Sequence, residues 1–86
     1  MVEKMVRIVN KTGLHARPAK DLCNVSKSFE CKITLLGKEQ KANAKSIINI
    51  LTMDLNMGEE VLVRAEGADE AEALETVTTF ISELTE

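Results

Sequence analysis

Residues 12–19 read Thr-Gly-Leu-His-Ala-Arg-Pro-Ala and contain the only histidine, His15, and the only proline, Pro18, of the 86-residue chain. A glycine at position 13 permits the positive φ of a sharp turn ahead of the imidazole. Proline suits the first turn of a helix, where its missing N–H is not needed, and it disfavours helical geometry in the preceding residue. The run therefore predicts a turn that delivers His15 to the start of a helix, which the residues alone would begin at Pro18.

An imidazole at the start of a helix, beside the guanidinium of Arg17, suits the transfer of a phosphoryl group. A neutral imidazole nitrogen can attack phosphorus, and nearby positive charge favours the neutral form. The N–H groups of a first helical turn bind phosphate, and Arg pairs with its oxygens. The predicted phosphate-binding backbone is that of Ala16 and Arg17. The plainer alternative is a surface histidine that only caps the helix.

The motif in residues 13–19 resembles the active-site signature of the HPr phosphocarrier family of the bacterial sugar phosphotransferase system. The likeness continues through residues 43–48 (Asn-Ala-Lys-Ser-Ile-Ile) and 65–69 (Ala-Glu-Gly-Ala-Asp) and covers essentially the whole chain. It implies that His15 accepts a phosphoryl group on Nδ1 from enzyme I, itself charged by phosphoenolpyruvate, and passes it to sugar-specific IIA proteins. It also implies that Arg17 balances charge on the transferring group and that the helix begins nearer Ala16.

A second candidate site begins at Ser46, which precedes the short apolar run 47–51. Serine is a favoured helix N-cap and predicts a short helix here, although the β-branched residues that follow do not favour one. The family resemblance implies that a dedicated kinase, HPr kinase/phosphorylase, phosphorylates Ser46. That modification would slow the carrier and act as a signal to a catabolite-control transcription regulator.

The resemblance further implies a docking surface for partner proteins around this helix. The residues expected to form it are Lys20, Lys45, Ile47, Ile48 and Leu51. Apolar residues at this spacing are typical of a core, so we expect at least one of the three to be buried. Lys20, Asp21 and Asn49 differ from residues that are frequent in the family, which leaves the preferred partner open.

The periodicity of the chain predicts the element order β-α-β-β-α-β-α. Strand patterns occur at residues 4–9, 32–36, 40–43 and 60–66, and helices are expected at about 18–29, beyond Ser46 and after Asp69. Asp69 and Glu72 match a capping box, and the last helix is expected to bury Leu74, Val77, Ile81 and Leu84, with Ala73 and Phe80 at the edge of that stripe. One apolar face per strand places the helices on one side of the sheet, an α+β fold. The resemblance adds an open-faced β-sandwich with antiparallel strands in the order first, fourth, second, third.

The composition limits the class of protein and its partners. The length suits a single domain over residues 1–86. No apolar run suggests membrane insertion or secretion, so we expect a cytoplasmic protein. We also expect a monomer. The net charge of −3 combines a basic part up to Lys45, with ten Lys or Arg against four acids, and a remainder with one Arg against ten acids. This asymmetry predicts steering toward acidic partners. With two aromatic residues and no Trp or Tyr, nucleic acid is not an expected partner.

Several other classes of protein fit the residues less well. Cys23 and Cys31 have no second Cys/His pair, so we expect two reduced, packed thiols and neither a metal nor another cofactor. The missing Cys-x-x-Cys disfavours a copper or metal chaperone. A hydrolase or phosphatase would need a base, an orienting group or a metal beside His15, and no local carboxylate accompanies it. A phosphoryl carrier, not an enzyme, is therefore predicted. A carrier of a nitrogen-regulatory branch of the same system shares His15 and stays open as an alternative, although Ser46 with Lys45 favours the sugar branch.

Overall fold

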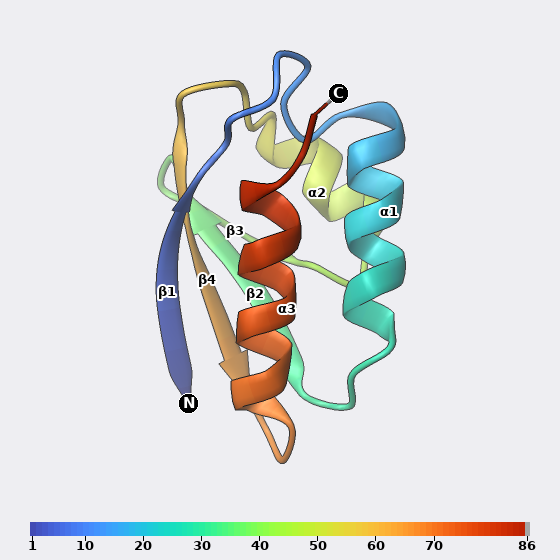
Figure 1. Cartoon of the computed structure of the whole chain (residues 1–86), viewed down its shortest axis with the longest axis vertical. Coiled ribbons are helices and arrows are strands. Elements are labelled where there is room, and N and C mark those ends of the chain that lie inside the picture. Colours follow the sequence, from blue (N-terminus) through green and yellow to red (C-terminus); the bar gives the residue numbers. More distant parts are fainter. Residues whose placement is uncertain (86) are drawn as a thin grey trace.

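The computed structural model describes residues 1–85, which form a four-stranded sheet with three helices on one of its faces (Figure 1). The elements in chain order are β1 (Val2–Arg7), α1 (Ala16–Lys27), β2 (Lys32–Gly37), β3 (Gln40–Asn43), α2 (Ile47–Met53), β4 (Glu60–Glu66) and α3 (Glu70–Ser82). The predicted element order and the α+β fold class are confirmed.

The strands lie in the order β1-β4-β2-β3, and neighbouring strands pair antiparallel. This is the order that the family resemblance implied. Val61, Val63 and Ala65 of the inner strand β4 are fully buried, whereas Leu62 and Arg64 between them are only half-buried. The alternation along β4 places the core on the helix side of the sheet and leaves the other face open to water.

The core between sheet and helices is filled from every layer. α1 contributes Leu22 and Cys23, and α2 contributes Ile50 and Met53. Cys23 and Cys31 are free, buried thiols, in keeping with a packing role, and burial raises the pKa of the Cys31 thiol. Within residues 1–85, no helix is both long and apolar enough to cross a membrane, and no group of His, Cys, Asp and Glu is arranged to hold a metal ion.

Several element boundaries differ from those that the residues alone predicted, and two of them lie next to His15 in the chain. α1 begins at Ala16, where the resemblance placed its start, and Pro18 is buried within the first turn. β1 ends at Arg7 instead of continuing to residue 9. Beyond it, Ile8 donates its N–H to the carbonyl of Glu59 and accepts from the N–H of Gly58, each at 2.8 Å. These bonds tie the loop that leads to His15 to the loop before β4.

The predicted capping box at α3 is wrong. Asp69 stands at the N-cap position, but its side chain makes no capping hydrogen bond. Its two carboxylate oxygens instead accept the backbone N–H groups of Glu30 and Cys31, each at 2.9 Å. These bonds, that of Glu30 first, lower the pKa of the Asp69 carboxyl. The side chain thus fastens the loop before β2 to the start of α3.

The buried stripe of α3 is also shifted from the predicted one. The buried residues are Ala73, Val77, Thr78 and Ile81, whereas Leu74, Phe80 and Leu84 are partly buried at the margin of the core. Thr78 tolerates burial because its hydroxyl donates to the carbonyl of Leu74 at 2.8 Å.

Candidate functional site

A tight turn positions His15 immediately before α1. Gly13 has a φ of 70°, and its Cα lies so close to the backbone of Leu55 that a β-carbon would collide with the Leu55 carbonyl oxygen. Leu14 is fully buried, and its N–H donates to that same oxygen at 2.9 Å. His15 follows as the N-cap residue of α1, with an extended backbone and a side chain that is 33% exposed.

The first turn of α1 carries the predicted phosphate-binding backbone. The N–H groups of such a turn lack acceptors within the helix and form the positive end of the helix dipole. Ala16 and Arg17 occupy this turn, directly after His15, and both are exposed. Ala16 has a φ of 50°, a left-handed conformation that costs a non-glycine residue about 1 kcal/mol.

The ring of His15 contacts two residues that the sequence analysis did not identify. Its Nε2 lies 3.1 Å from Oδ1 of Asp54 and 3.3 Å from Oδ1 of Asn56. The expectation that no local carboxylate accompanies His15 is therefore wrong. Asp54 is distant in the sequence and reaches the ring only because α1 and α2 pack against each other. No spacing or motif along the chain links the two positions, so sequence reasoning had no signal for this pair.

The loop after α2 is tightly bonded and holds both of these residues in place. Asn56 donates its side-chain Nδ2 to the backbone carbonyl of Asp54 at 2.8 Å and its backbone N–H to the Glu59 carboxylate at 2.7 Å. Lys38 reaches the same loop from the β2–β3 turn, donating to the Asp54 carbonyl at 2.6 Å and pairing with Glu59 at 3.3 Å. The backbone N–H of Asn56 is the largest cause that lowers the pKa of the Glu59 carboxyl, with Lys38 adding to it.

Ser46 is the N-cap of α2, as predicted. Its hydroxyl oxygen accepts from the backbone N–H of Asn49 at 3.4 Å and from the Asn49 side chain at 3.1 Å. α2 has seven residues and is therefore about 10 Å long. Because Asp54 caps the other end of α2, Ser46 and His15 lie at opposite ends of this short helix.

The apolar residues of the predicted docking surface are all exposed, and the expectation that at least one of them is buried is wrong. Ile47, Ile48 and Leu51 are 37%, 71% and 39% exposed, respectively. Ile50 and Met53 fill the core in their place. The short helix thus presents one apolar face to the core and a second to solvent.

The two lysines of the predicted docking surface differ in their surroundings. Lys20 is exposed on α1. Lys45 is half-buried, and its ammonium donates to the backbone carbonyl of Phe29 at 2.6 Å, just beyond the end of α1. The charge of Lys45 is therefore partly committed to holding α1 and α2 together.

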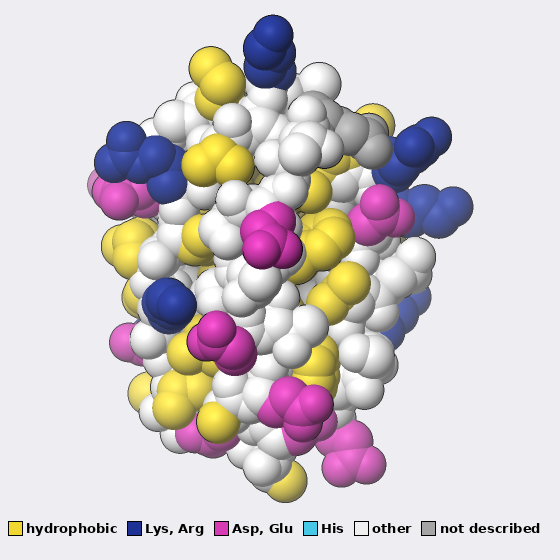
Figure 2. All heavy atoms as spheres, viewed as in Figure 1, with side chains coloured by type: hydrophobic (Ala, Val, Ile, Leu, Met, Phe, Trp, Pro, Cys, Tyr) yellow, Lys and Arg dark blue, Asp and Glu magenta, His cyan; other side chains and the backbone are white. Residues whose placement is uncertain are grey.

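The charge asymmetry of the sequence is visible on the surface. In the view of Figure 2, acidic side chains lie over the part of the surface occupied by α3, and basic side chains lie mainly around its margin. α3 supplies Glu70, Glu72 and Glu75 to this region. Basic residues of α1, among them Arg17 and Lys20, are exposed on another element.

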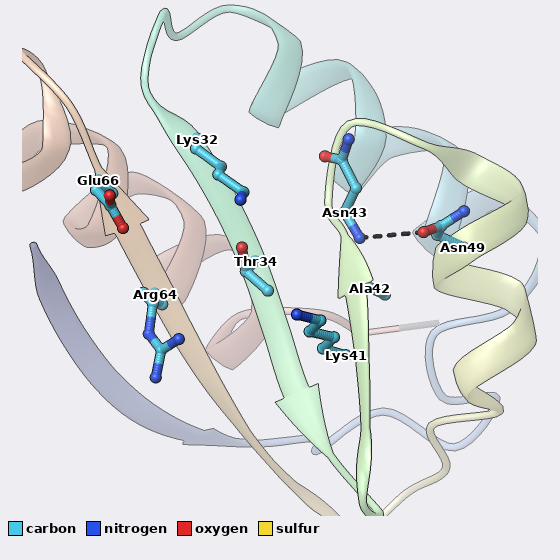
Figure 3. A pocket seen from close by; sticks show the side chains of 8 residues that line it. All are labelled: Lys32, Thr34, Lys41, Ala42, Asn43, Asn49, Arg64 and Glu66. Atoms are coloured by element: carbon cyan, nitrogen blue, oxygen red, sulfur yellow. Dashed lines mark hydrogen bonds between the residues drawn. The ribbon is translucent and has the colours of Figure 1, made fainter.

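A hollow of about 290 Å³ lies on the open face of the sheet (Figure 3). Lys32, Thr34, Lys41 and Arg64 are among the residues that line it. Arg64 is already paired with Glu3, whose carboxylate lies 2.5 Å from its Nε. The hollow shares no residue with the surroundings of His15, so it is not part of the candidate site.

The chain resembles known proteins in family, in sequence and in structure. The chain matches the family model described as the PTS HPr component phosphorylation site over residues 2–83. The phosphocarrier HPr of Treponema pallidum is 39% identical over 90% of this chain and 88% of its own. The phosphocarrier NPr of Shewanella violacea is 34% identical over 93% and 88% of the two chains, and the HPr-like protein Crh of Bacillus subtilis is 37% identical over 96% and 98%.

Two solved structures extend this likeness to the fold. HPr-C-His from Thermoanaerobacter tengcongensis has a TM-score of 0.91 at 40% identity, covering 94% of this chain and 91% of the other. Crh of Bacillus subtilis, solved as a swapped dimer, has a TM-score of 0.78 at 36% identity, covering 100% and 99%. The turn, the histidine at the helix start and the open-faced sheet occur here in a chain that matches one family over nearly all its length. This chain belongs to the HPr family of phosphocarrier proteins, which carry phosphoryl groups and are not enzymes.

Proposed function

We propose that His15 accepts a phosphoryl group from phosphorylated enzyme I and donates it to sugar-specific IIA proteins. The observation that carries the proposal is the position of the imidazole. It belongs to the N-cap residue of α1, is one-third exposed and makes no capping bond of its own, so the N–H groups of the first helical turn stay available to a phosphate. A phosphoryl group on the ring would lie where those groups and the helix dipole stabilise its charge. Arg17, exposed in the same turn, balances charge on the group as it transfers.

The contact between His15 and Asp54 does not favour a hydrolase. Asp54 touches Nε2, whereas a phosphoryl group on Nδ1 would leave from the other side of the ring. Hydrolysis requires a base that activates water in line with the breaking N–P bond. A carrier has the opposite need, because its phosphoryl group must survive until a partner arrives.

We propose that partners dock on the exposed face of α2 and the adjoining part of α1. Ile48 supports this most directly, because 71% of a large apolar side chain is exposed to water. Ile47 and Leu51 extend the apolar area, and Lys20 and Lys45 supply positive charge to acidic partners. Leu51 lies one helical turn before Asp54, which touches His15, so a partner bound there would reach the imidazole.

Ser46 is proposed as a second phosphorylation site, modified by HPr kinase/phosphorylase and read by a catabolite-control regulator. Its hydroxyl lies at the N-terminus of α2, where a phosphate is tolerated. Added negative charge beside the docking surface would repel acidic partners without unfolding the helix. The relative Crh is described as a catabolite repression protein, which supports this regulatory arm.

A carrier of a nitrogen-regulatory branch is the second candidate function, and the NPr relative supports it. The two are separated by rates of phosphorylation from the sugar-branch enzyme I and from its nitrogen-branch counterpart. We propose the sugar branch and a cytoplasmic location, so the sugar-branch enzyme should charge this chain faster. If the nitrogen-branch enzyme charges the chain faster, the protein belongs to the nitrogen-regulatory branch and the sugar-branch assignment is wrong.

We also propose that the phosphoryl-accepting form is a monomer. Solved structures of related proteins include dimers of Crh and of HPr, so the oligomeric state needs its own measurement. Light scattering coupled to gel filtration should give the mass of one chain, before and after phosphorylation. A dimer that persists and accepts phosphoryl would contradict this.

Transfer itself is tested with purified components. The protein is incubated with phosphoenolpyruvate and catalytic enzyme I, and intact mass is recorded before and after treatment with acid. We expect one acid-labile phosphoryl group, which is lost again when a IIA protein is added. Failure to gain this group from any enzyme I of the system would overturn the proposal.

A further inference from the structure

The amide of Asn56 has a defined orientation. Its Nδ2 donates to the backbone carbonyl of Asp54 at 2.8 Å, which only the amide nitrogen can do. The atom directed at His15 is therefore the amide oxygen, at 3.3 Å from Nε2. The backbone N–H of Asn56, held by Glu59 at 2.7 Å, fixes the residue from its other side.

Among residues 1–85, the two side-chain groups within hydrogen-bonding distance of Nε2, those of Asp54 and Asn56, are both acceptors. An amide oxygen and an ionised carboxylate have no proton to donate, so a hydrogen bond to either requires the proton on Nε2. In a neutral imidazole the lone pair is then on Nδ1. We infer that Asp54 and Asn56 are positioning residues that hold His15 in the Nε2–H tautomer. They thereby leave a lone pair on Nδ1, the nitrogen that the family resemblance already implies as the phosphoryl acceptor. The tautomer follows from the contacts alone, and its use in transfer rests on the proposed function.

The same contact assists the charge that develops during transfer. As Nδ1 forms its bond to phosphorus, the bond from phosphorus to the donor breaks and its electron pair leaves with the donor. No proton needs to leave the ring, because Nε2 keeps its own, and the imidazole becomes positively charged. The Asp54 carboxylate, 3.1 Å from Nε2, stabilises that charge. A carboxylate on one nitrogen of an imidazole plays the same orienting and stabilising part in Ser-His-Asp sites. When the phosphoryl group is donated onward, the ring returns to the neutral Nε2–H form.

The backbone at Asp54 makes a clean test possible. Asp54 has a φ of 51° and a ψ of 52°, a left-handed conformation that glycine and asparagine adopt readily. Asp54→Gly removes the carboxylate without straining the turn, and Asp54→Asn keeps an acceptor but removes the charge. Glu39→Gly is a matched control, because Glu39 is also an exposed acid with a positive φ, in the turn between β2 and β3.

The tautomer is read from the ¹⁵N chemical shifts of the His15 ring at about pH 9, well above the ordinary pKa of histidine. The wild type and Glu39→Gly should show a protonated Nε2 and an unprotonated Nδ1. The double variant Asp54→Gly/Asn56→Ala should move both shifts toward a mixture of tautomers. A wild-type ring protonated on Nδ1, or shifts unchanged in the double variant, would overturn the inference.

Rates are measured with phosphoramidate, a small phosphoryl donor that needs no protein partner. We expect Asp54→Asn to keep the tautomer and to accept phosphoryl about fivefold more slowly, the size typical of one exposed charge contact. Glu39→Gly should react at the wild-type rate. Equal rates in Asp54→Asn and the wild type would exclude the charge-stabilising part. A wild type that shows the tautomer and reacts with phosphoramidate, but not with any enzyme I, would refute the proposed function and leave this inference standing.

Discussion

Asp54 ends α2 in a left-handed conformation and places its carboxylate 3.1 Å from Nε2 of His15 at the start of α1. The C-terminal end of α2 thereby contacts the side chain of the residue at the N-cap position of α1. The arrangement depends on the loops around it, which lie together at one end of the molecule (Figure 1). Gly13 against Leu55, and Ile8 against Gly58 and Glu59, join those loops through backbone contacts.

Gly13→Ala should destabilise the protein by at least about 2 kcal/mol. The substitution adds a left-handed penalty to a collision with the Leu55 carbonyl, in a turn whose next residue is fully buried. Gly58→Ala is the matched control, because Gly58 also has a positive φ, of 91°, but a β-carbon there would meet nothing within 4 Å. Urea denaturation should show a loss of about 1 kcal/mol for this control. Equal losses in both variants would mean that the close approach to Leu55 is unimportant.

Ser46→Ala should lower the free energy of unfolding by about 1 kcal/mol, because α2 loses the acceptor for the Asn49 N–H. Ser46→Asp keeps a capping oxygen and adds negative charge, so its stability should stay near that of the wild type. Phosphoryl transfer from enzyme I should nevertheless be slower in Ser46→Asp than in Ser46→Ala. The reverse order of transfer rates would argue against regulation through charge.

Ile48→Ser should impair transfer without unfolding the protein. The side chain is 71% exposed, so its removal should change stability by no more than about 0.5 kcal/mol. If partners dock on this residue, the Michaelis constant of enzyme I for the variant protein should be higher than for the wild type. Ile50→Ala, on the buried side of the same helix, is the contrasting variant and should cost about 3 kcal/mol in denaturant unfolding. An unchanged Michaelis constant for Ile48→Ser would remove Ile48 from the docking surface.

Asp69→Asn should reduce the loss of unfolding free energy that occurs as the pH falls into the acid range. The Glu30 and Cys31 N–H groups lower the pKa of the Asp69 carboxyl in the folded protein. A carboxyl whose folded pKa is depressed adds stability above its unfolded pKa, about 3.9, and that stability is lost as pH falls through the folded value. Unfolding should therefore be followed from pH 6 down to about pH 2. Glu59 and Glu70, whose pKa values are also lowered, contribute to both curves, so the test is the difference between them. Parallel curves for variant and wild type would contradict the role of Asp69.

Arg17→Lys should lower the rate of phosphoryl transfer without preventing the phosphorylation of His15. Lysine keeps the positive charge but lacks the planar fork that pairs with two phosphate oxygens. Single-turnover transfer from phosphorylated enzyme I measures the effect, with Lys27→Arg, an exposed residue in the last turn of the same helix, as the control. If Arg17→Lys transfers at the wild-type rate, the planar fork of Arg17 is unimportant and only its positive charge contributes.

The strands and the inward alternation of β4 could be predicted, because apolar and polar residues alternate along the sequence with a period of two. The strand order could not, since periodicity says nothing of which strands are neighbours, and only the family resemblance supplied it. The start of α1 shows the limit of a local rule. Proline disfavours helical geometry in the residue before it, yet α1 begins two residues before Pro18, with Ala16 in a strained conformation.

The candidate site divides in the same way. His15, Arg17 and Ser46 lie in local motifs and could be identified from the sequence. Asp54 and Asn56 could not, because tertiary packing alone brings them to the ring. Asp69 failed as a predicted helix cap because its carboxylate has two other N–H donors in the loop before β2. The exposure of Ile47, Ile48 and Leu51 could not be predicted, because Ile and Leu are among the residue types most often buried.

The most direct test compares the wild type with His15→Ala, both incubated with phosphoenolpyruvate and enzyme I and observed by phosphorus NMR. Circular dichroism and urea unfolding first establish that His15→Ala is folded, as its one-third exposed side chain leads us to expect. The wild type should show one acid-labile phosphohistidine signal, on Nδ1, and the variant should show none. An equal signal from His15→Ala, or none from the wild type, would contradict the assignment of His15 as the phosphoryl acceptor.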